Sequence, residues 1–102
     1  MFIVELTYKA PLTEVDKYLQ AHREFLDYYY KQGLLLVSGP LKPRTGGIII
    51  ALTKDRSYLE SILEQDPYHL AEIADFKLLE FTPVKHRDEL KDIIQNTEGK
   101  LC

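Results

Sequence analysis

Histidine is the side chain best suited to acid–base chemistry near neutral pH, and one of the three histidines in this sequence occupies an unusual position. Residues 15–32 carry apolar side chains at helical spacing, which predicts an amphipathic helix with a buried face formed by Val15, Leu19, Phe25, Leu26 and Tyr29. His22 falls within that apolar stripe. A neutral imidazole there can act as a general base when a partner fixes its tautomer. The alternative is a core histidine that hydrogen-bonds a backbone carbonyl or a tyrosine hydroxyl.

The other residues that could do chemistry form weaker patterns. We expect His69 and His86 at the surface, although His69 could compete with His22 for the role of base. No histidine has a second ligand at i+4 on the same face, so we expect no metal site. The single cysteine, Cys102, can form neither an internal disulfide nor a thiolate zinc site, which disfavours a zinc-dependent nucleotide cyclohydrolase.

Size and composition describe one soluble globular domain. The chain has 102 residues, of which 45% are hydrophobic and 28% are charged. A formal net charge of −3 argues against a nucleic-acid partner, because there is no basic excess to release counterions. Residues 1–10 lack the features of a signal peptide and no apolar run reaches transmembrane length, so we expect a cytoplasmic protein without membrane association.

Alternation and apolar runs predict four strands, at 2–8, 34–38, 48–53 and 73–82. Gly39-Pro40 is expected to close the second strand, and a loop is expected at 41–47. The first helix is expected to run from an N-cap at Thr13 to about residue 32, with Gly33 as a left-handed C-cap. A second helix follows Ser57, which has capping-box spacing with Glu60, and a third is expected at 87–96.

This order predicts an α+β fold of the ferredoxin-like βαββαβ type, with a four-stranded antiparallel sheet, both crossover helices on one face, and an extra C-terminal helix. The runs at 34–37 and 48–50 are apolar on both sides, although the helices can cover only one face. We therefore expect a homodimer in which two open sheet faces pack together. Alternatively, the terminal helix folds over part of that face. The expected boundaries are a domain at 1–83 and a C-terminal helical extension at 84–102.

Three fragments, in this order, resemble the YciI-like family of small dimeric α+β barrel proteins: His22 in the first long helix, Ser38-Gly39-Pro40 after the second strand, and Asp66-Pro67-Tyr68 after the second helix. The resemblance covers about residues 1–83 and implies a dimeric barrel with a cleft lined by a His–Asp pair. One member of the family is a dehydrochlorinase that acts on a chlorinated hydroxyquinol. The wider superfamily includes muconolactone isomerase and haem-degrading monooxygenases, so the resemblance indicates a site more than an activity.

The resemblance implies that His22 and Asp66 are catalytic, because a carboxylate that accepts from one ring nitrogen leaves the other free to take a proton. Asp-Pro is also a frequent turn initiator, so Asp66 could instead cap its own loop. Ser38-Gly39-Pro40 could present hydroxyl and amide groups to the polar end of a substrate, or simply turn the chain. Tyr68 either closes the substrate pocket or fills the core.

Three hypotheses on function follow. The first is a small enzyme without a cofactor, which moves a proton on a cyclic oxygenated substrate by lyase, isomerase or dehydrochlorinase-like chemistry. The second is a module that binds or senses a small molecule without chemistry. The third is a structural dimer in which His22 is a core residue, so that His22→Leu would be neutral or stabilising. An RNA-recognition domain also fits the topology, but the aromatic and basic motif of that class is missing.

Overall fold

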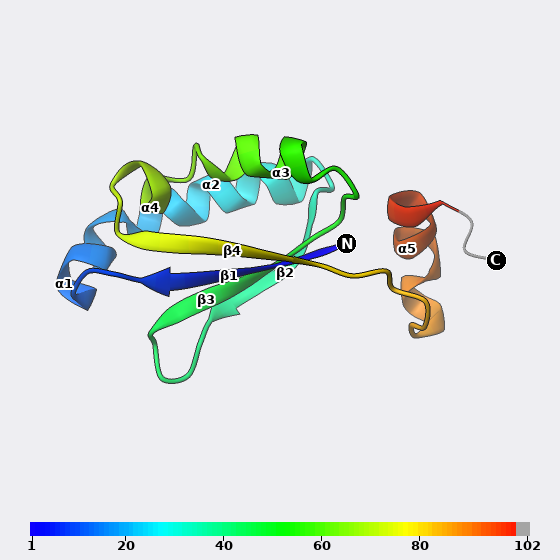
Figure 1. Cartoon of the computed structure of the whole chain (residues 1–102), viewed down its shortest axis with the longest axis horizontal. Helices are drawn as coiled ribbons and strands as arrows, with labels where there is room; N and C mark the ends of the chain where they lie inside the picture. The colour runs from blue at the N-terminus through cyan, green and yellow to red at the C-terminus, as the bar shows by residue number, and fades with distance from the viewer. Residues whose placement is uncertain (100–102) are drawn as a thin grey trace.

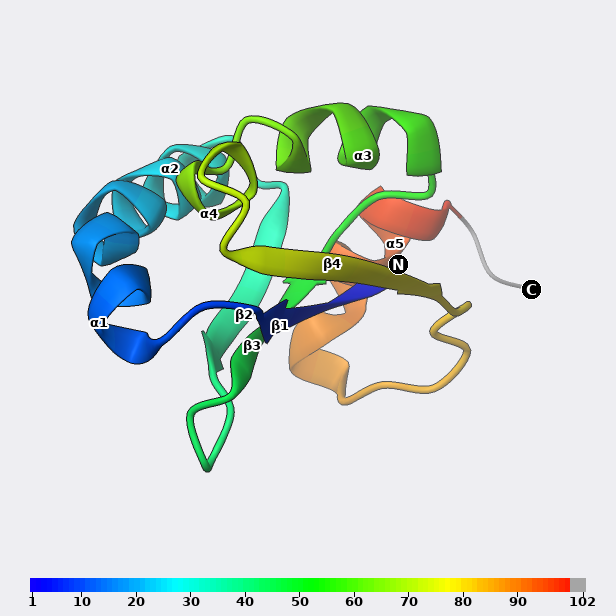
Figure 2. The same ribbon diagram turned by 60° about the vertical axis from the view of Figure 1, so that its left-hand side comes forward.

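The computed structural model describes residues 1–99 and has a sheet of four antiparallel strands in the order β2-β3-β1-β4 (Figure 1). The strands are β1 (Phe2–Tyr8), β2 (Leu35–Pro40), β3 (Gly46–Ala51) and β4 (Ala74–Glu80). The helices are α1 (Leu12–Val15), α2 (Leu19–Lys31), α3 (Arg56–Leu63), α4 (Pro67–Leu70) and α5 (Lys91–Glu98), with 3₁₀ turns at Asp16–Tyr18 and Asp88–Leu90. Helices α2 and α3 lie on the same face of the sheet (Figures 1 and 2), which confirms the predicted ferredoxin-like α+β fold. Cys102 lies outside the described residues.

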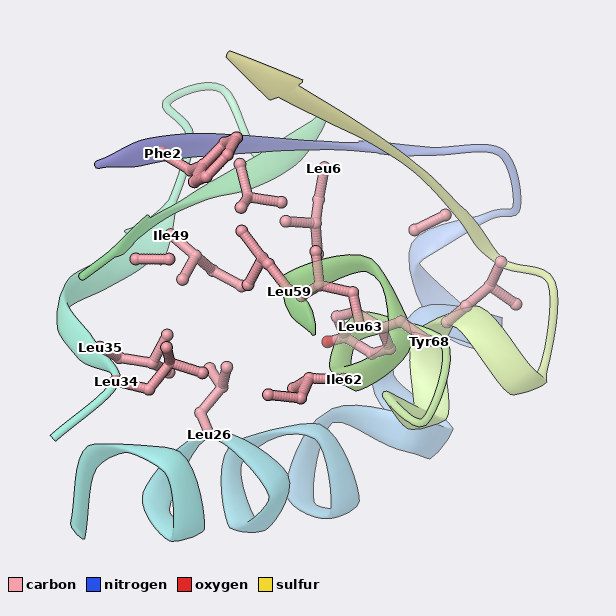
Figure 3. Packing of buried hydrophobic residues seen from close by; sticks show 14 of the residues in the cluster. Phe2, Leu6, Leu26, Leu34, Leu35, Ile49, Leu59, Ile62, Leu63 and Tyr68 are labelled. Atoms are coloured by element: carbon pink, nitrogen blue, oxygen red, sulfur yellow. The ribbon is translucent and has the colours of Figure 1, made fainter. Parts of the chain in front are cut away.

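The core lies between the sheet and the two long helices. Alternation along β1 turns Phe2, Val4 and Leu6 inward, and each is at most 2% exposed. Helix α3 faces them with an apolar side centred on Leu59, which is fully buried (Figure 3). This packing fixes α3 against the sheet.

The first helical segment begins earlier than predicted and is not continuous. Pro11, not Thr13, precedes the first helical residue, and its carbonyl accepts from the N–H groups of Glu14 and Val15 at 2.9 and 3.1 Å. The extended ψ of Pro11 turns that carbonyl into the helix, so no side-chain cap at Thr13 is needed. A 3₁₀ turn at Asp16–Tyr18 then separates α1 from α2, where a single helix was expected.

The end of α2 has the predicted left-handed glycine. Gly33 has a φ of +77°, and its N–H donates to the Tyr30 carbonyl at 3.0 Å. The next residue, Leu34, donates to the Tyr29 carbonyl at 3.0 Å, which completes a Schellman motif. The reversal directs the chain from α2 into β2.

Aspartates begin both of the following helices. The Asp55 carboxylate accepts from the Tyr58 N–H at 3.0 Å, so Asp55 caps α3 and the predicted cap, Ser57, is already inside the helix. Asp66 caps the single turn of α4 by accepting from the Tyr68 N–H at 2.9 Å. Since Asp66 is also a candidate catalytic residue, this cap ties the site to the local fold.

Gly39 and Pro40 belong to β2, which corrects the expectation that they close it. Pro40 lies opposite Gly47 of β3. Because β2 is an edge strand, a proline without an N–H is tolerated there. The turn signal of Gly39-Pro40 was therefore overridden by the position of the strand in the sheet.

A β-bulge in β2 decides which way its side chains face. The register with β3 shifts by one residue between Leu35 and Val37. After the shift, Ser38 lies opposite Ile49, which is 2% exposed on the inner face. Ser38 therefore faces the helices, and Val37 faces the other side of the sheet.

The outer face of the sheet carries a row of aliphatic side chains that crosses all four strands. Ile50 pairs with Val37 on one side and with Ile3 on the other, and Ile3 pairs with Leu79. We call these four residues the aliphatic row. Val37 is 54% exposed and Leu79 is 44% exposed.

Helix α5 lies beyond the end of the sheet (Figure 1). Glu98 at its end forms an ion pair with the amino group of Met1, and its carbonyl accepts from Lys54. These contacts connect the end of α5 to the N-terminus and to the segment after β3. Val37 and Leu79, at the two ends of the aliphatic row, remain largely exposed, and coverage of part of this face by the terminal helix stays the alternative to a dimer.

Candidate active site

His22 and Asp66 are distant in the chain and lie in contact in the structure. Nδ1 of His22 is 2.9 Å from both carboxylate oxygens of Asp66. The Asp66 side chain is fully buried and the His22 side chain is 11% exposed. An ionised carboxylate can only accept, so Nδ1 carries the proton and donates it to Asp66. Nε2 of the neutral ring then presents a lone pair, and the hydrogen bonds found among residues 1–99 leave it free.

Asp66 is fixed in place by the start of α4. The same carboxylate that accepts from His22 also accepts from the Tyr68 N–H at 2.9 Å. Pro67 occupies the first helical position, where its missing N–H costs nothing. Asp66 can therefore cap its own loop and also act as the partner of His22, because one carboxylate makes both sets of hydrogen bonds.

The Tyr68 ring supports the imidazole from a second direction. The centroids of the His22 and Tyr68 rings are 4.0 Å apart and their planes differ by 8°, which is a stacked arrangement. Tyr68 is 1% exposed. His22 is therefore oriented by two residues of the α4 segment, one in the plane of the ring and one against its face.

A cavity of about 500 Å³ opens beside His22, between α2 and the inner side of the sheet. Its volume suits a ligand with a single ring. The lining residues are Leu6, Tyr8, Leu19, His22, Arg23, Leu26, Ser38, Gly39, Pro40, Arg44, Gly47, Ile48, Ile49 and Tyr68. All the candidate substrate-binding residues named from the sequence lie on this wall, and Asp66 lies behind it.

The three residues Ser38-Gly39-Pro40 line the cavity as part of a strand rather than as a loop. The Ser38 hydroxyl is 2.6 Å from the hydroxyl of Tyr30, so one of the two donates to the other. This contact ties the end of α2 to β2 and fixes the direction of the Ser38 side chain. Ser38 keeps hydrogen-bonding capacity for a ligand, because a hydroxyl both donates and accepts.

A second polar cluster lies on the same cavity wall, formed by Arg44, Tyr8 and the hydroxyl end of Tyr68. The Arg44 guanidinium carbon is 5.8 Å from the centroid of the Tyr8 ring, and Nη2 forms an ion pair with Asp16 at 2.7 Å. The rings of Tyr8 and Tyr68 meet edge to face at 5.9 Å. The cavity therefore has a second polar group in its wall, which adjoins His22 through the Tyr68 ring.

The sequence prediction missed Arg44 and Tyr8. Tyr8 continues the inward alternation of β1, so its position on the inner face was available from the pattern. Arg44 lies in the loop between β2 and β3, where no periodicity indicates direction. Its place in the cavity follows only from the three-dimensional path of that loop.

The remaining histidines lie away from the pair. His69 is exposed, with its ring 5.8 Å from that of Phe76, and His86 is exposed. Within residues 1–99, no three or more His, Cys, Asp or Glu side chains gather in a way that could hold a metal ion. None of the helices in the described part of the chain is long and apolar enough to cross a bilayer.

Comparison with known families decides the classification. The profile of the YCII-related domain family matches residues 1–82, from the first strand through the last. The chain belongs to this family. The YCII-related match includes both His22 and Asp66 and leaves α5 outside.

One solved structure shares the fold of this YCII-related chain: 5-chloro-2-hydroxyhydroquinone dehydrochlorinase (TftG) from Burkholderia phenoliruptrix AC1100, in complex with 2,5-dihydroxybenzoquinone. The similarity has a TM-score of 0.63 at 20% sequence identity and covers 87% of this chain and 98% of the other. No curated protein matches the sequence.

Proposed function

We propose that this YCII-related protein is a small enzyme that moves a proton on a cyclic, oxygenated substrate, by lyase, isomerase or dehydrochlorinase-like chemistry. The observation that carries the proposal is the buried contact of His22 with Asp66, at 2.9 Å, on the wall of a cavity of about 500 Å³. General base catalysis needs an imidazole with one nitrogen fixed and the other open to the ligand. The fold similarity to a dehydrochlorinase is consistent with this class of reaction.

In the proposed step, Nε2 of His22 takes a proton from a C–H or O–H group of the substrate ring. The electron pair of that bond moves into the ring, and in a dehydrochlorination chloride leaves with the electrons of its own bond. Asp66 stabilises the imidazolium that forms, as an adjacent carboxylate does in other acid–base pairs. The proton then passes to water, or returns to a different ring atom in an isomerisation. His22 takes part in every proton transfer of this scheme, so the proposed reaction needs no cofactor.

The rest of the cavity would hold the substrate. We assign Ser38-Gly39-Pro40 and Tyr68 to substrate binding, because they line the cavity next to His22. The Ser38 hydroxyl offers a hydrogen bond to a ring oxygen, and the Tyr68 ring fixes the base. Apolar side chains such as Leu26 and Ile49 would exclude water from the reacting atoms.

Turnover measurements test the proposal. Candidate substrates are 5-chloro-2-hydroxyhydroquinone and a panel of hydroxylated cyclic acids and quinols, with chloride release and absorbance as readouts. We expect His22→Gln to reduce turnover by about 10²–10⁴-fold, since this is the usual contribution of a general base. His69→Gln is the matched control, because His69 is exposed and outside the cavity. If His22→Gln and Asp66→Asn turned over a substrate as fast as the wild type, the proposal would be wrong.

The tautomer of His22 gives a test that needs no substrate. In Asp66→Asn, the side-chain oxygen remains the acceptor for the Tyr68 N–H, so the new NH₂ group faces Nδ1 of His22. Two donors cannot share that contact, and we expect the neutral ring to move its proton to Nε2. The ¹⁵N shifts of the imidazole would report Nδ1–H in the wild type and Nε2–H in the variant. An unchanged tautomer would show that Asp66 does not orient the ring.

A binding or sensing module is the second candidate, and the cavity itself favours it. A cavity of this size and lining can hold a ligand without changing it. The two candidates separate when a bound ligand is recovered from the protein. Unchanged ligand, together with no turnover of any compound in the panel, would favour the binding module.

We also propose that two copies form a homodimer through the aliphatic row. This row leaves Val37 and Leu79 largely exposed, and the two long helices α2 and α3 lie on the other face of the sheet. Burying such a row against its equivalent removes apolar area from water at about 25 cal/mol per Å². In this arrangement residues 1–83 form the catalytic unit, and 84–102 remain an extension of undefined role.

The oligomeric state tests the dimer directly. Ile50 lies at the centre of the aliphatic row, so we expect Ile50→Lys to yield monomers in analytical ultracentrifugation. Leu70→Lys is the control, because Leu70 is 69% exposed on α4 and lies outside the row. A wild-type protein that sediments as a monomer at high concentration would refute the dimer and leave the acid–base proposal untouched.

A further inference from the structure

A buried hydroxyl in the cavity wall has no role in the acid–base pair. The Tyr68 hydroxyl is buried, and no hydrogen bond of good geometry reaches it from residues 1–99. The Tyr68 ring stacks on His22, and its hydroxyl lies beside Tyr8 and Arg44. Buried polar groups in folded proteins almost always have a partner, and the exceptions are often found where a ligand binds. Because Tyr68 lines the cavity, a ligand that reaches this hydroxyl would supply the missing partner.

Arg44 brings a positive charge to the same place. Its ion pair with Asp16, at 2.7 Å, raises the pKa of Arg44, so the guanidinium stays charged at every physiological pH. The Asp16 side chain is 52% exposed, so water screens its interaction with Arg44. The Asp16 carboxylate therefore neutralises little of the charge that Arg44 presents to the cavity. A guanidinium has five N–H donors, and the contact with Asp16 engages one nitrogen. Donors of Arg44 remain for a ligand.

The protonation state of Tyr68 suits the same kind of ligand. Burial raises the pKa of Tyr68 to about 12. The hydroxyl is therefore protonated near neutral pH and can donate a hydrogen bond. A neutral donor next to a fixed cation, in a site with little water, stabilises a negatively charged oxygen more than a neutral one.

We propose that Arg44 and the Tyr68 hydroxyl, with Tyr8 beside them, bind an anionic oxygen of the ligand, either a carboxylate or an ionised enol. His22 and this anion site flank the same cavity, so one ring can reach both. The inference rests on the proposed function insofar as the same cavity holds the substrate. The anion site narrows the proposed substrate class to ring compounds that carry an acidic oxygen in addition to the group that gives up the proton to His22.

Binding measurements with three small probes test the anion site. Hydroquinone is neutral near neutral pH, 2,5-dihydroxybenzoate adds a carboxylate to the same ring, and 2,5-dihydroxybenzoquinone supplies an ionised enol. Isothermal titration calorimetry should show at least one anionic probe binding about tenfold more tightly than hydroquinone. Which of the two binds more tightly identifies the carboxylate or the enol as the preferred group.

Substitutions in the cavity wall test which residues cause the preference for an anionic probe. We expect Arg44→Gln and Tyr68→Phe each to weaken the anionic probe by about 5- to 50-fold and to leave hydroquinone unchanged. Arg23→Gln is the matched control, because it removes the same charge from an exposed side chain that water screens, and it should change binding by less than about twofold. NMR spectra would verify that each variant is folded, and Arg44→Lys should recover part of the affinity because it keeps the charge.

Several results would overturn the anion site. They are equal binding of all three probes by the wild type, unchanged binding in Arg44→Gln, or a loss in Arg23→Gln in place of Arg44→Gln. The proposed acid–base function is judged separately, by the His22 tautomer in Asp66→Asn and by turnover in His22→Gln. A failed anion site would leave those two results as they are.

Discussion

The two long helices cover the same face of the sheet but pack on it differently. Around Leu59 the space under α3 is filled: Leu59 is fully buried, and Ile62 and Leu63 are each 5% exposed. A pocket of about 470 Å³ lies at the edge of this region, between α3 and β4. Under α2 a cavity of about 500 Å³ reaches the inner side of the sheet and is lined by residues that include His22 and Leu26. We call the region around Leu59 the solid half of the layer and the region beside His22, with polar groups in its wall, the open half.

The difference shows how a small domain can hold a buried carboxylate. Placing Asp66 in a fully buried position is unfavourable unless its hydrogen bonds are fixed. One of those bonds comes from His22 of α2, and the other comes from α4, which follows directly after α3 and so is positioned by the solid half. The packed region thereby holds the reactive region in place, and substitutions in the two regions should have different consequences.

The largest expected loss of stability is in the solid half. Leu59→Ala should lower the free energy of unfolding by about 2–5 kcal/mol, because it leaves a cavity with no solvent access. Urea unfolding measures this change. The control Leu70→Ala, at a site that is 69% exposed, should stay within about 0.5 kcal/mol of the wild type. Equal effects at the two sites would contradict the description of α3 as the packed half.

The loss of the contact between His22 and Asp66 should have the next largest effect. His22→Leu should lower the free energy of unfolding by about 3 kcal/mol, because it leaves the carboxylate of Asp66 buried without its main partner. The same substitution in an Asp66→Asn background should cost less, since no charge is then stranded. A neutral or stabilising His22→Leu would instead support the hypothesis that the histidine is a core residue without function.

Leu26→Ala provides a matched comparison with Leu59→Ala. Leu26 is 8% exposed and borders the existing cavity, so its removal enlarges a space that is already open. We expect a loss of about 1–2 kcal/mol, which is mainly the transfer term. A loss as large as that of Leu59→Ala would mean that the space under α2 closes up in solution.

The smallest effect near neutral pH is expected for Tyr68→Phe, because the hydroxyl has no hydrogen bond in the described part of the chain to lose. The difference in the free energy of unfolding between the wild type and Tyr68→Phe should grow at high pH. The folded-state pKa of Tyr68 is raised from its ordinary value of 10.0 to about 12, so the unfolded chain releases this proton first. The resulting stabilisation is complete below pH 10 and disappears as the pH rises through 12. Burial also raises the pKa of Tyr29, so urea unfolding at several pH values should show a decline in both proteins that is steeper in the wild type than in Tyr68→Phe.

Sequence rules succeeded where structure is decided locally. Alternation predicted the bounds of β1, and the left-handed end of α2 at Gly33 follows from backbone chemistry within one turn. Helical periodicity also placed His22 on the inward face of α2. The pairing of His22 with Asp66 came from the family resemblance, because 44 residues of chain separate the two side chains.

The failures share a physical cause, which is that the neighbouring strands and loops decided the outcome. Gly39-Pro40 reads as a turn in isolation, but an edge strand accepts it. Arg44 reads as a solvated loop residue, but the loop returns it to the cavity. The position of β2 at the edge of the sheet decides the first case, and the path of the loop between β2 and β3 decides the second.

The bulge in β2 links two properties of the molecule that lie on opposite faces of one strand. It places Ser38 toward the cavity and Val37 in the aliphatic row. Leu36 is the extra residue of the bulge, so its removal would make the pairing with β3 continuous and leave Val37 opposite Ile50 and Ser38 opposite Ile49. Substrate recognition and self-association therefore depend on the same register along this strand. A slip of β2 by one residue against β3 would exchange its two faces, so neither property can be changed there by the register alone.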